Sequence, residues 1–251
     1  MAFLELDHVS VVFPAVQGLF SARKSAPVVA VDGVSLSVEK GEILGLVGES
    51  GCGKSTLSRT VMLLQKPTEG RIFLEGEELT ALSASEVRKR RPDFQMVFQD
   101  PYATLKEALQ SRRKRTFAQT RDDVAELMEK VGLSPSLMRK YPHEFSGGQR
   151  QRVAIARALA PEPRLVIADE PVSALDVSIQ SQILNLLIAL ARDLSLTMIF
   201  ISHDLSVVHY IADRIAVMRK GRIVEYGEAD KVFSSPSHEY TQALLAAVPR
   251  L

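Results

Sequence analysis

The segment Gly48 to Ser55, with the sequence GESGCGKS, constrains this chain more than any other feature. It fits the phosphate-loop pattern of a glycine, four residues and then Gly-Lys-Ser. Residues 42–48, EILGLVG, are mostly apolar and predict a buried strand before the loop, and residues 55–64 predict a helix after it. The alternative is a glycine turn that merely begins a helix. The strand-loop-helix context favours the phosphate loop.

The chemistry of such a loop follows from its residue types. Glycines let the backbone wrap closely around a phosphate with its N–H groups pointing inward, and the helix N-terminus adds partial positive charge. We expect Lys54 to reach the β- and γ-phosphates and the Ser55 hydroxyl to hold Mg²⁺. The predicted nucleotide-binding residues of this segment are Gly48, Glu49, Ser50, Gly51, Cys52, Gly53, Lys54, Ser55 and Thr56.

Composition narrows the class of protein. The chain has 251 residues, 46% of them hydrophobic and 24% charged, as in ordinary globular proteins. Its formal net charge of +1 provides no global basic field for nucleic acid. The single cysteine excludes an intrachain disulfide and a cysteine-rich metal site. The N-terminus lacks a signal-peptide pattern, so we expect a cytosolic chain unless a partner holds it at a membrane.

Hydrophobic patterning predicts an α/β organisation. Alternating runs at 3–13 and 28–40 predict antiparallel strands, and a short strand is expected at 71–76. Continuous apolar runs predict strands buried on both faces at 165–168, 198–201 and 215–218. Helices are expected at 105–140, 177–192 and 240–248, with a hairpin at 222–226. The basic run at 88–91 favours a solvated helix face.

Four further motifs follow the phosphate loop in a fixed order. They are MVFQDP at 96–101, FSGGQRQRVAIARAL at 145–159, LVIADEP at 165–171 with SALD at 173–176, and IFISHD at 199–204. Together with the loop they resemble the nucleotide-binding subunits of ABC transporters over nearly the whole chain. The resemblance implies an α/β P-loop NTPase fold with a mostly parallel sheet core, an antiparallel β subdomain and an inserted α-helical subdomain. It implies a single domain over 1–251, with a core of 1–91 and 161–228, a helical subdomain of 92–160 and a C-terminal tail of 229–251.

The resemblance also implies roles in ATP hydrolysis. Asp169 ends a buried strand and would serve the Mg²⁺ shell together with Ser55 and Gln99. Glu170 is placed to polarise the attacking water. His203 would contact the γ-phosphate, and Gln99 would sense the γ-phosphate and Mg²⁺. The expected catalytic residues are therefore Glu170, His203, Lys54 and Gln99.

A second half-site is implied at the SGGQ segment. Ser146 is a good N-cap, and the glycines open a helix, which makes a second anion site. The resemblance implies that Ser146, Gly147, Gly148 and Gln149 bind the γ-phosphate of a nucleotide held by an opposite subunit. Asp176 would lie at that dimer seam. For the aromatic that stacks on adenine, Phe13 is the candidate and Phe20 the alternative.

Three segments resemble the ATP-binding subunits of peptide/nickel importers: residues 30–56, 141–149 and 236–249. The implied function is ATP hydrolysis that powers import of a peptide, nickel or a metal–chelator complex. The implied partners are two membrane permeases, a sister ATPase or a second copy, and indirectly an extracytoplasmic solute-binding protein. The chain would sit on the cytoplasmic face of the membrane. Departures from the pattern are a short stretch before Tyr141, which bears on membrane coupling, and Glu239 and Gln242 in the tail.

Two other function classes stay open. A soluble ABC-type ATPase that acts on nucleic acid or ribosomes usually carries tandem cassettes, zinc modules or long coiled coils, and the sequence has none of these patterns. A nonhydrolysing regulatory cassette would not be expected to keep Lys54, Asp169, Glu170, Ser146 and His203.

Cys52 is interpreted as a small filler residue whose alkylation would block ATP sterically.

Overall fold

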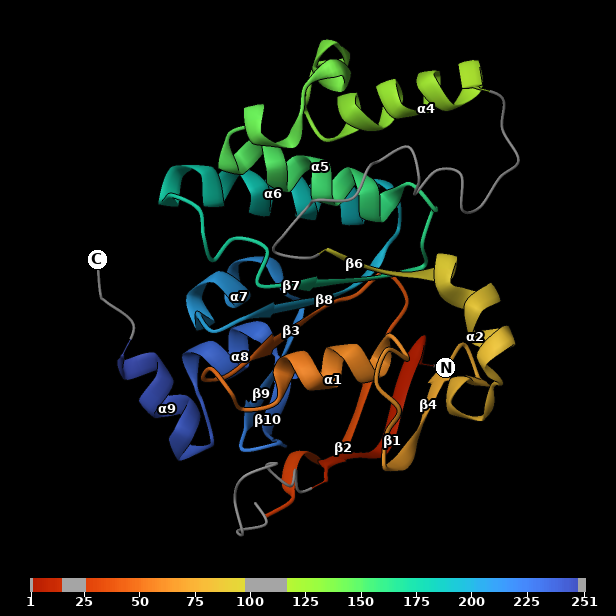
Figure 1. Cartoon of the computed structure of the whole chain (residues 1–251). Coiled ribbons are helices and arrows are strands. Elements are labelled where there is room, and N and C mark those ends of the chain that lie inside the picture. Colours follow the sequence, from red (N-terminus) through yellow and green to blue (C-terminus); the bar gives the residue numbers. More distant parts are fainter. Residues whose placement is uncertain (1, 15–25, 98–116, 248–251) are drawn as a thin grey trace, which may run out of the picture.

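A six-stranded sheet organises the fold in the computed structural model, which describes residues 2–14, 26–97 and 117–247 (Figure 1). Five strands run parallel and β10 is antiparallel to β9. The order is β10-β9-β3-β8-β7-β6. The strands are β3 (Ile43–Val47), β6 (Phe94–Val97), β7 (Leu165–Asp169), β8 (Thr197–Ser202), β9 (Arg214–Arg219) and β10 (Arg222–Glu228).

All of these strands except β6 were predicted from the sequence. β6 is four residues long and follows a short 3₁₀ turn, so it carries too little periodicity to be recognised. It pairs with β7 from Phe94 to Val97, and the core sheet therefore extends into the segment 92–160 that was expected to form the helical subdomain.

A second, four-stranded sheet is antiparallel throughout, as predicted. Its order is β2-β1-β4-β5, with β1 (Leu4–Phe13), β2 (Val28–Val38), β4 (Glu69–Leu74) and β5 (Glu77–Glu78). Phe13 pairs with Val28, and Val12 pairs with Val29. This pairing fixes where the end of β1 lies, and that position becomes important for the nucleotide site.

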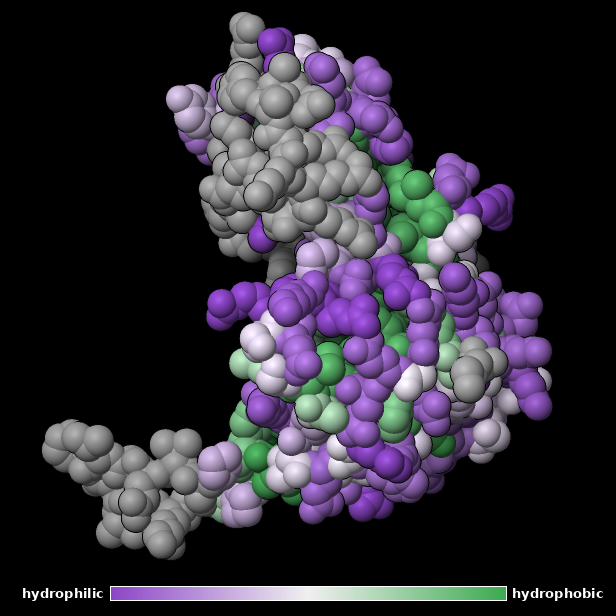
Figure 2. Space-filling view, turned by 90° about the vertical axis from the view of Figure 1, so that its right-hand side faces the viewer, coloured by the Kyte–Doolittle hydropathy of each residue, from purple (hydrophilic) through white to green (hydrophobic). Residues whose placement is uncertain are grey.

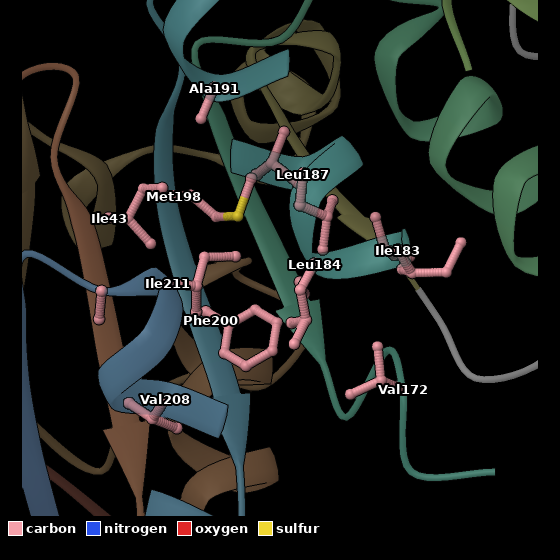
Figure 3. Close-up of a cluster of buried hydrophobic side chains, with 14 of the residues drawn as sticks. Ile43, Val172, Ile183, Leu184, Leu187, Ala191, Met198, Phe200, Val208 and Ile211 are labelled. Atoms are coloured by element: carbon pink, nitrogen blue, oxygen red, sulfur yellow. The ribbon is translucent and has the colours of Figure 1, made fainter. Parts of the chain in front are cut away.

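The two faces of the six-stranded sheet bury different cores because successive strand residues point to opposite faces. Along β8, Met198 and Phe200 belong to one core, whereas Ile199 and Ile201 belong to the other. The first core packs under helices α6 (Val177–Asp193) and α7 (Leu205–Ile211), where Leu187 and Ile211 lie over β8 (Figure 3). The second core joins the sheet to helix α1 (Lys54–Val61) and to the antiparallel sheet.

The described helices surround these sheets. They are α1 (Lys54–Val61), α2 (Ala84–Arg90), α4 (Phe117–Lys130), α5 (Gly147–Leu159), α6 (Val177–Asp193), α7 (Leu205–Ile211), α8 (Ala229–Ser234) and α9 (Glu239–Ala246). α4, α5 and α6 gather on one side of the core sheet (Figure 1). Single 3₁₀ turns are η1 (Leu79–Ala81), η2 (Arg91–Asp93), η3 (Pro135–Arg139) and η4 (Pro142–Glu144). Among the described helices, none combines the length and apolar character needed to cross a bilayer.

Helix α2 carries all of the basic run except Arg91 and buries none of its residues, in agreement with the predicted solvated face. A capping box begins it, in which Ser83 accepts the Glu86 amide and Glu86 accepts the Ser83 amide. The face of the molecule that contains this helix is mostly hydrophilic, with small apolar patches (Figure 2).

Candidate functional site

The predicted phosphate loop lies at the carboxyl end of β3, between neighbouring strands β8 and β9. Two of its glycines are enclosed by backbone: a Cβ at Gly48 would lie 2.1 Å from the Met218 carbonyl oxygen, and one at Gly53 would lie 2.2 Å from that of Ala30. Gly51, at φ +80°, has nothing within 4 Å of such a position. The loop is therefore fixed against the protein on one side and open on the other, as a phosphate cradle requires.

Lys54 begins α1 and is buried, with 5% of its surface exposed. Its Nζ donates to the carbonyl oxygens of Gly48 at 2.6 Å and Glu49 at 2.9 Å. The ammonium is thus held inside the loop by backbone acceptors. An ammonium has three N–H donors, so Lys54 can also donate to a phosphate while the two carbonyls hold it in place, and such a bond to an anion is of the stronger kind.

Asp169 ends β7 beside the phosphate loop. Its carboxylate interacts with the hydroxyl of Ser55, at the start of α1. Burial raises the pKa of Asp169, and the Glu170 charge adds to the rise. The Ser55 hydrogen bond and the Lys54 charge oppose it only in part. A bound cation would favour the ionised carboxylate here.

Ser55 and Asp169 together offer the hard oxygen ligands that Mg²⁺ prefers. Among the described residues no group of three or more His, Cys, Asp or Glu side chains could hold a metal by itself. This arrangement fits Mg²⁺, which usually takes one or two protein ligands and completes its shell with phosphates and water.

Glu170 and His203 come from neighbouring strands, β7 and β8, and meet at the same edge. The Glu170 amide donates to the Ile201 carbonyl at 3.0 Å, and His203 Nδ1 lies 3.5 Å from Glu170 Oε1. Glu170 has φ +48°, which a non-glycine residue rarely adopts and which functional sites often retain. The structure therefore brings together the loop, Asp169, Glu170 and His203, as the sequence motifs predict.

Phe13 ends β1 and pairs with Val28 at the start of β2. The two residues are 40% and 61% exposed. Two positions further along β2, the Ala30 carbonyl oxygen lies against the loop, 2.2 Å from where a Cβ at Gly53 would be. The pairing therefore leaves an exposed apolar pair at the start of the strand that leads to the loop. Phe20, the alternative, lies outside the described residues.

The SGGQ segment begins α5 with a capping box, in which Ser146 Oγ accepts the Gln149 amide at 3.3 Å and Gln149 accepts the Ser146 amide at 3.1 Å. Ser146 is exposed. A Cβ at Gly147 would lie 3.3 Å from Leu175, and one at Gly148 would lie 2.7 Å from Ile179. The glycines therefore allow α5 to pack closely on the start of α6.

Asp176 occupies the N-cap position of α6 but forms no side-chain cap hydrogen bond, and the residue is exposed. Val177 beside it is 80% exposed. Such an acid and apolar pair on the surface is compatible with a contact to another subunit. Within the loop, Glu49 and Ser50 are exposed, Cys52 is buried and Thr56 is partly buried. Gln99 lies outside the described residues.

One residue at the loop was missed by the sequence analysis. The Tyr240 hydroxyl, on helix α9 of the tail, accepts a hydrogen bond from the Glu49 amide at 3.0 Å. The two residues are 191 positions apart, so no local pattern could indicate the contact. The only available signal was the prediction of an amphipathic helix around Tyr240.

Comparisons with known proteins agree with this geometry. Residues 31–173 match the family model described as "ABC transporter", and residues 224–251 match "Oligopeptide/dipeptide transporter, C-terminal region". The oligopeptide transport ATP-binding protein AppF of Bacillus subtilis is 52% identical over 98% of this chain and 78% of its own length. The dipeptide transport ATP-binding protein DppF of Escherichia coli is 47% identical over 95% of this chain and 74% of its own.

Solved structures show the same fold. CbiO1 from Clostridium perfringens, part of the ABC transporter complex CbiONQ, superposes with a TM-score of 0.79 at 28% identity, over 93% of this chain and 91% of its own. A dimeric bacterial ABC transporter cassette superposes with a TM-score of 0.76 at 29% identity, over 90% and 98%.

Proposed function

The chain belongs to the ATP-binding proteins of ABC transporters, and from that premise we propose that it powers the import of oligopeptides or dipeptides through partner permeases. The observation that carries the proposal is the C-terminal match at 224–251 to the oligopeptide/dipeptide transporter region. Relatives whose names specify oligopeptide and dipeptide transport support it, since they are about half identical to the chain over nearly all of its length. Nickel and metal–chelator complexes, as alternative transported solutes, lack this support from the names of the relatives.

The reaction assigned to the chain is attack of water on the γ-phosphate of ATP. Glu170 is the group that orients the water and accepts its proton, because it lies at the open edge of the sheet beside Asp169. His203 is assigned to the γ-phosphate, and its position 3.5 Å from Glu170 supports that role. Lys54 stabilises the charge that develops on the phosphates, while its two backbone carbonyls hold it within the loop.

Ser55 and Asp169 would hold Mg²⁺, which, when bound, neutralises negative charge on the β- and γ-phosphates. The raised pKa of Asp169 supports this assignment, because a carboxylate that burial destabilises gains most from a cation. Gln99 completes the proposed metal and catalytic set and lies outside the described residues.

Adenine is assigned to the exposed surface at Phe13. Phe13 is 40% exposed, and its partner Val28 is two positions from Ala30, whose carbonyl oxygen lies against the loop. Aromatic stacking on a base contributes about 1–3 kcal/mol. Replacing Phe13 by Ala should therefore weaken ATP binding about 5- to 150-fold. The same replacement should have a much smaller effect on the binding of inorganic triphosphate, because that ligand has no base.

A complete site requires a second ATPase, either a sister subunit or a second copy. Ser146 would bind the γ-phosphate of the nucleotide held by that subunit, and Asp176 would lie at the contact. The exposure of Ser146, Asp176 and Val177 supports this arrangement. Two permeases would hold the pair at the cytoplasmic face of the membrane, and a solute-binding protein outside would deliver the peptide.

The proposal is tested by uptake in cells from which the gene for this chain is deleted. Re-expression of the wild-type chain should restore uptake of labelled di- and tripeptides, and expression of Glu170→Gln at an equal level should not. Uptake of a labelled free amino acid serves as the control and should not change. Peptide uptake that is the same with and without the chain would contradict the proposal.

A further inference from the structure

The C-terminal tail is fastened to the core sheet before it reaches the nucleotide site. Glu225 of β10 accepts hydrogen bonds from the amide and hydroxyl of Ser237, at 2.7 and 2.8 Å, and from the amide of His238 at 3.1 Å. Burial by itself would raise the pKa of Glu225, but the hydrogen bonds from Ser237 and the His238 amide oppose it and the pKa is lowered. The carboxylate is therefore ionised and holds the start of α9 in place.

Helix α9 then positions Tyr240. His238 is its N-cap, and His238 Nδ1 accepts the Tyr240 amide at 3.0 Å. The Tyr240 residue is 6% exposed, and the guanidinium of Arg219 lies 4.8 Å from the centre of its ring. Arg219 also pairs with Glu239 at 3.6 Å. The tyrosine ring is thus fixed on several sides, so its hydroxyl presents a rigid acceptor.

That acceptor contacts one particular peptide unit of the phosphate loop. The unit joins Gly48 to Glu49, and its N–H, on Glu49, donates to the Tyr240 hydroxyl at 3.0 Å. Its C=O, on Gly48, accepts from Lys54 Nζ at 2.6 Å. Because a peptide unit is planar, fixing its N–H also fixes the direction of its C=O. Tyr240 therefore sets the orientation of the carbonyl that holds the Lys54 ammonium.

We propose that Tyr240 is a positioning residue for nucleotide binding. Its hydroxyl holds the Gly48–Glu49 peptide unit so that the loop and Lys54 are arranged before ATP arrives. The tail region characteristic of oligopeptide/dipeptide transporters thereby acts on the phosphate loop of its own chain. The inference rests on the proposed nucleotide site, since it assigns a role in forming that site.

The matched comparison is Tyr226 on β10. Its hydroxyl is likewise hydrogen-bonded to the backbone, although it donates to the Ser37 carbonyl rather than accepting an amide, and Arg214 lies over its ring at 4.3 Å. Ser37 is on β2 and is not part of the phosphate loop. Tyr226→Phe therefore removes a similar hydrogen bond from a similar environment without touching the loop.

The experiment measures MgATP binding by the full chain with isothermal titration calorimetry. Tyr240→Phe keeps the ring and removes the acceptor. It should raise the Kd about 3- to 10-fold, the range expected for the loss of one hydrogen bond. Tyr226→Phe should leave the Kd unchanged, even if both variants melt at a lower temperature. In the assembled transporter, Tyr240→Phe should raise the KM for ATP and leave kcat unchanged.

A Kd for Tyr240→Phe equal to that of the wild type would overturn the role of Tyr240, and so would an equal weakening in Tyr226→Phe. Failure of the wild-type chain to bind MgATP would instead refute the proposed nucleotide site. If Tyr240→Phe does not fold, the hydrogen-exchange rate of the Glu49 amide in the wild-type chain tests the inference instead. A slowly exchanging amide supports the inference, and exchange at the rate of an exposed amide overturns it.

Discussion

His203 Nδ1 lies 3.5 Å from Glu170 Oε1, although the two residues are 33 positions apart and follow different strands. Their meeting is a consequence of the sheet order, in which β7 and β8 are neighbours and run parallel. His203 is 57% exposed and Glu170 is 31% exposed, so both side chains remain accessible to a ligand. Catalytic hydrogen bonds in ligand-free enzymes are often this long and shorten in the complex.

Replacing Glu170 by Gln should separate ATP binding from hydrolysis. The amide keeps the size of the side chain but cannot accept a proton from water. We expect MgATP binding to persist and phosphate release by the assembled transporter to fall about 10²- to 10⁴-fold. Glu69→Gln, at the exposed start of strand β4, is the control and should hydrolyse ATP normally. Undiminished turnover in Glu170→Gln would refute the assignment of Glu170.

Ser146→Ala should reduce hydrolysis through the assembled pair of ATPases. Loss of the cap costs about 1 kcal/mol of stability, and loss of a phosphate donor should cost about 10²-fold in turnover. Binding of MgATP to the isolated chain should not change, because Ser146 is assigned to the nucleotide of the opposite subunit.

Ser83→Ala is the matched control for Ser146→Ala. Ser83 begins α2 with the same kind of capping box, but α2 is not part of the site. It should show a similar loss of stability with normal turnover. Equal turnover in the two variants would mean that Ser146 is only a cap.

Alkylation of Cys52 should abolish MgATP binding. It is the only cysteine, so N-ethylmaleimide reacts with the chain at one thiol. Its Sγ lies 3.8 Å from Lys54 Nζ, inside the loop, where an added group would obstruct the phosphates. Burial raises the pKa of Cys52, and the Lys54 charge opposes this only in part.

The thiolate is the reactive form, so labelling should be slow at pH 7 and should accelerate as the pH rises. Cys52→Ala should bind MgATP before and after the same treatment. Full ATPase activity after complete labelling, followed by mass spectrometry, would contradict this prediction.

The buried carboxylate of Glu42 should lower the free energy of unfolding at neutral pH. It is 8% exposed, and burial raises its pKa, with the Glu39 amide and Arg214 opposing the rise. The folded chain therefore keeps this proton to a higher pH than the unfolded chain does. The free energy of unfolding should fall as the pH rises from the ordinary carboxyl pKa through the folded pKa.

Glu42→Gln removes this charge and retains an acceptor for the Glu39 amide, which now lies 2.5 Å from Glu42 Oε2. Its melting temperature at pH 7 should rise by about 2–4 °C, as a gain of roughly 1 kcal/mol gives in a chain of this size. At a pH low enough to protonate Glu42 in both states the gain should vanish. A lower melting temperature at pH 7 would show that the pair with Arg214 outweighs burial.

The sequence predicted most of the site because its residues follow strands with continuous apolar runs. Once β3, β7 and β8 are recognised, the parallel topology brings Lys54, Asp169 and His203 to one edge. Strand β6 was missed because four residues carry too little periodicity. The position of Phe13 opposite Val28 could not be predicted, because the register of β1 against β2 depends on a pairing that no local pattern specifies.

The contact between Tyr240 and Glu49 could not be predicted for a different reason. It depends on the path of the tail after β10, which is fixed by Glu225 and the His238 cap. Each of these bonds involves common polar residues whose sequence pattern indicates only a turn and a helix start. The functional consequence appears only when the tail is folded onto the loop.

Affinity isolation of the tagged Glu170→Gln chain tests the central claim most directly. The chain would be recovered from detergent-solubilised native membranes with MgATP present, and its partners identified by mass spectrometry. We predict co-isolation of two membrane permeases and a second ATPase subunit. Recovery of only soluble partners, nucleic acid or ribosomes would contradict the transport function and favour a soluble ABC-type ATPase.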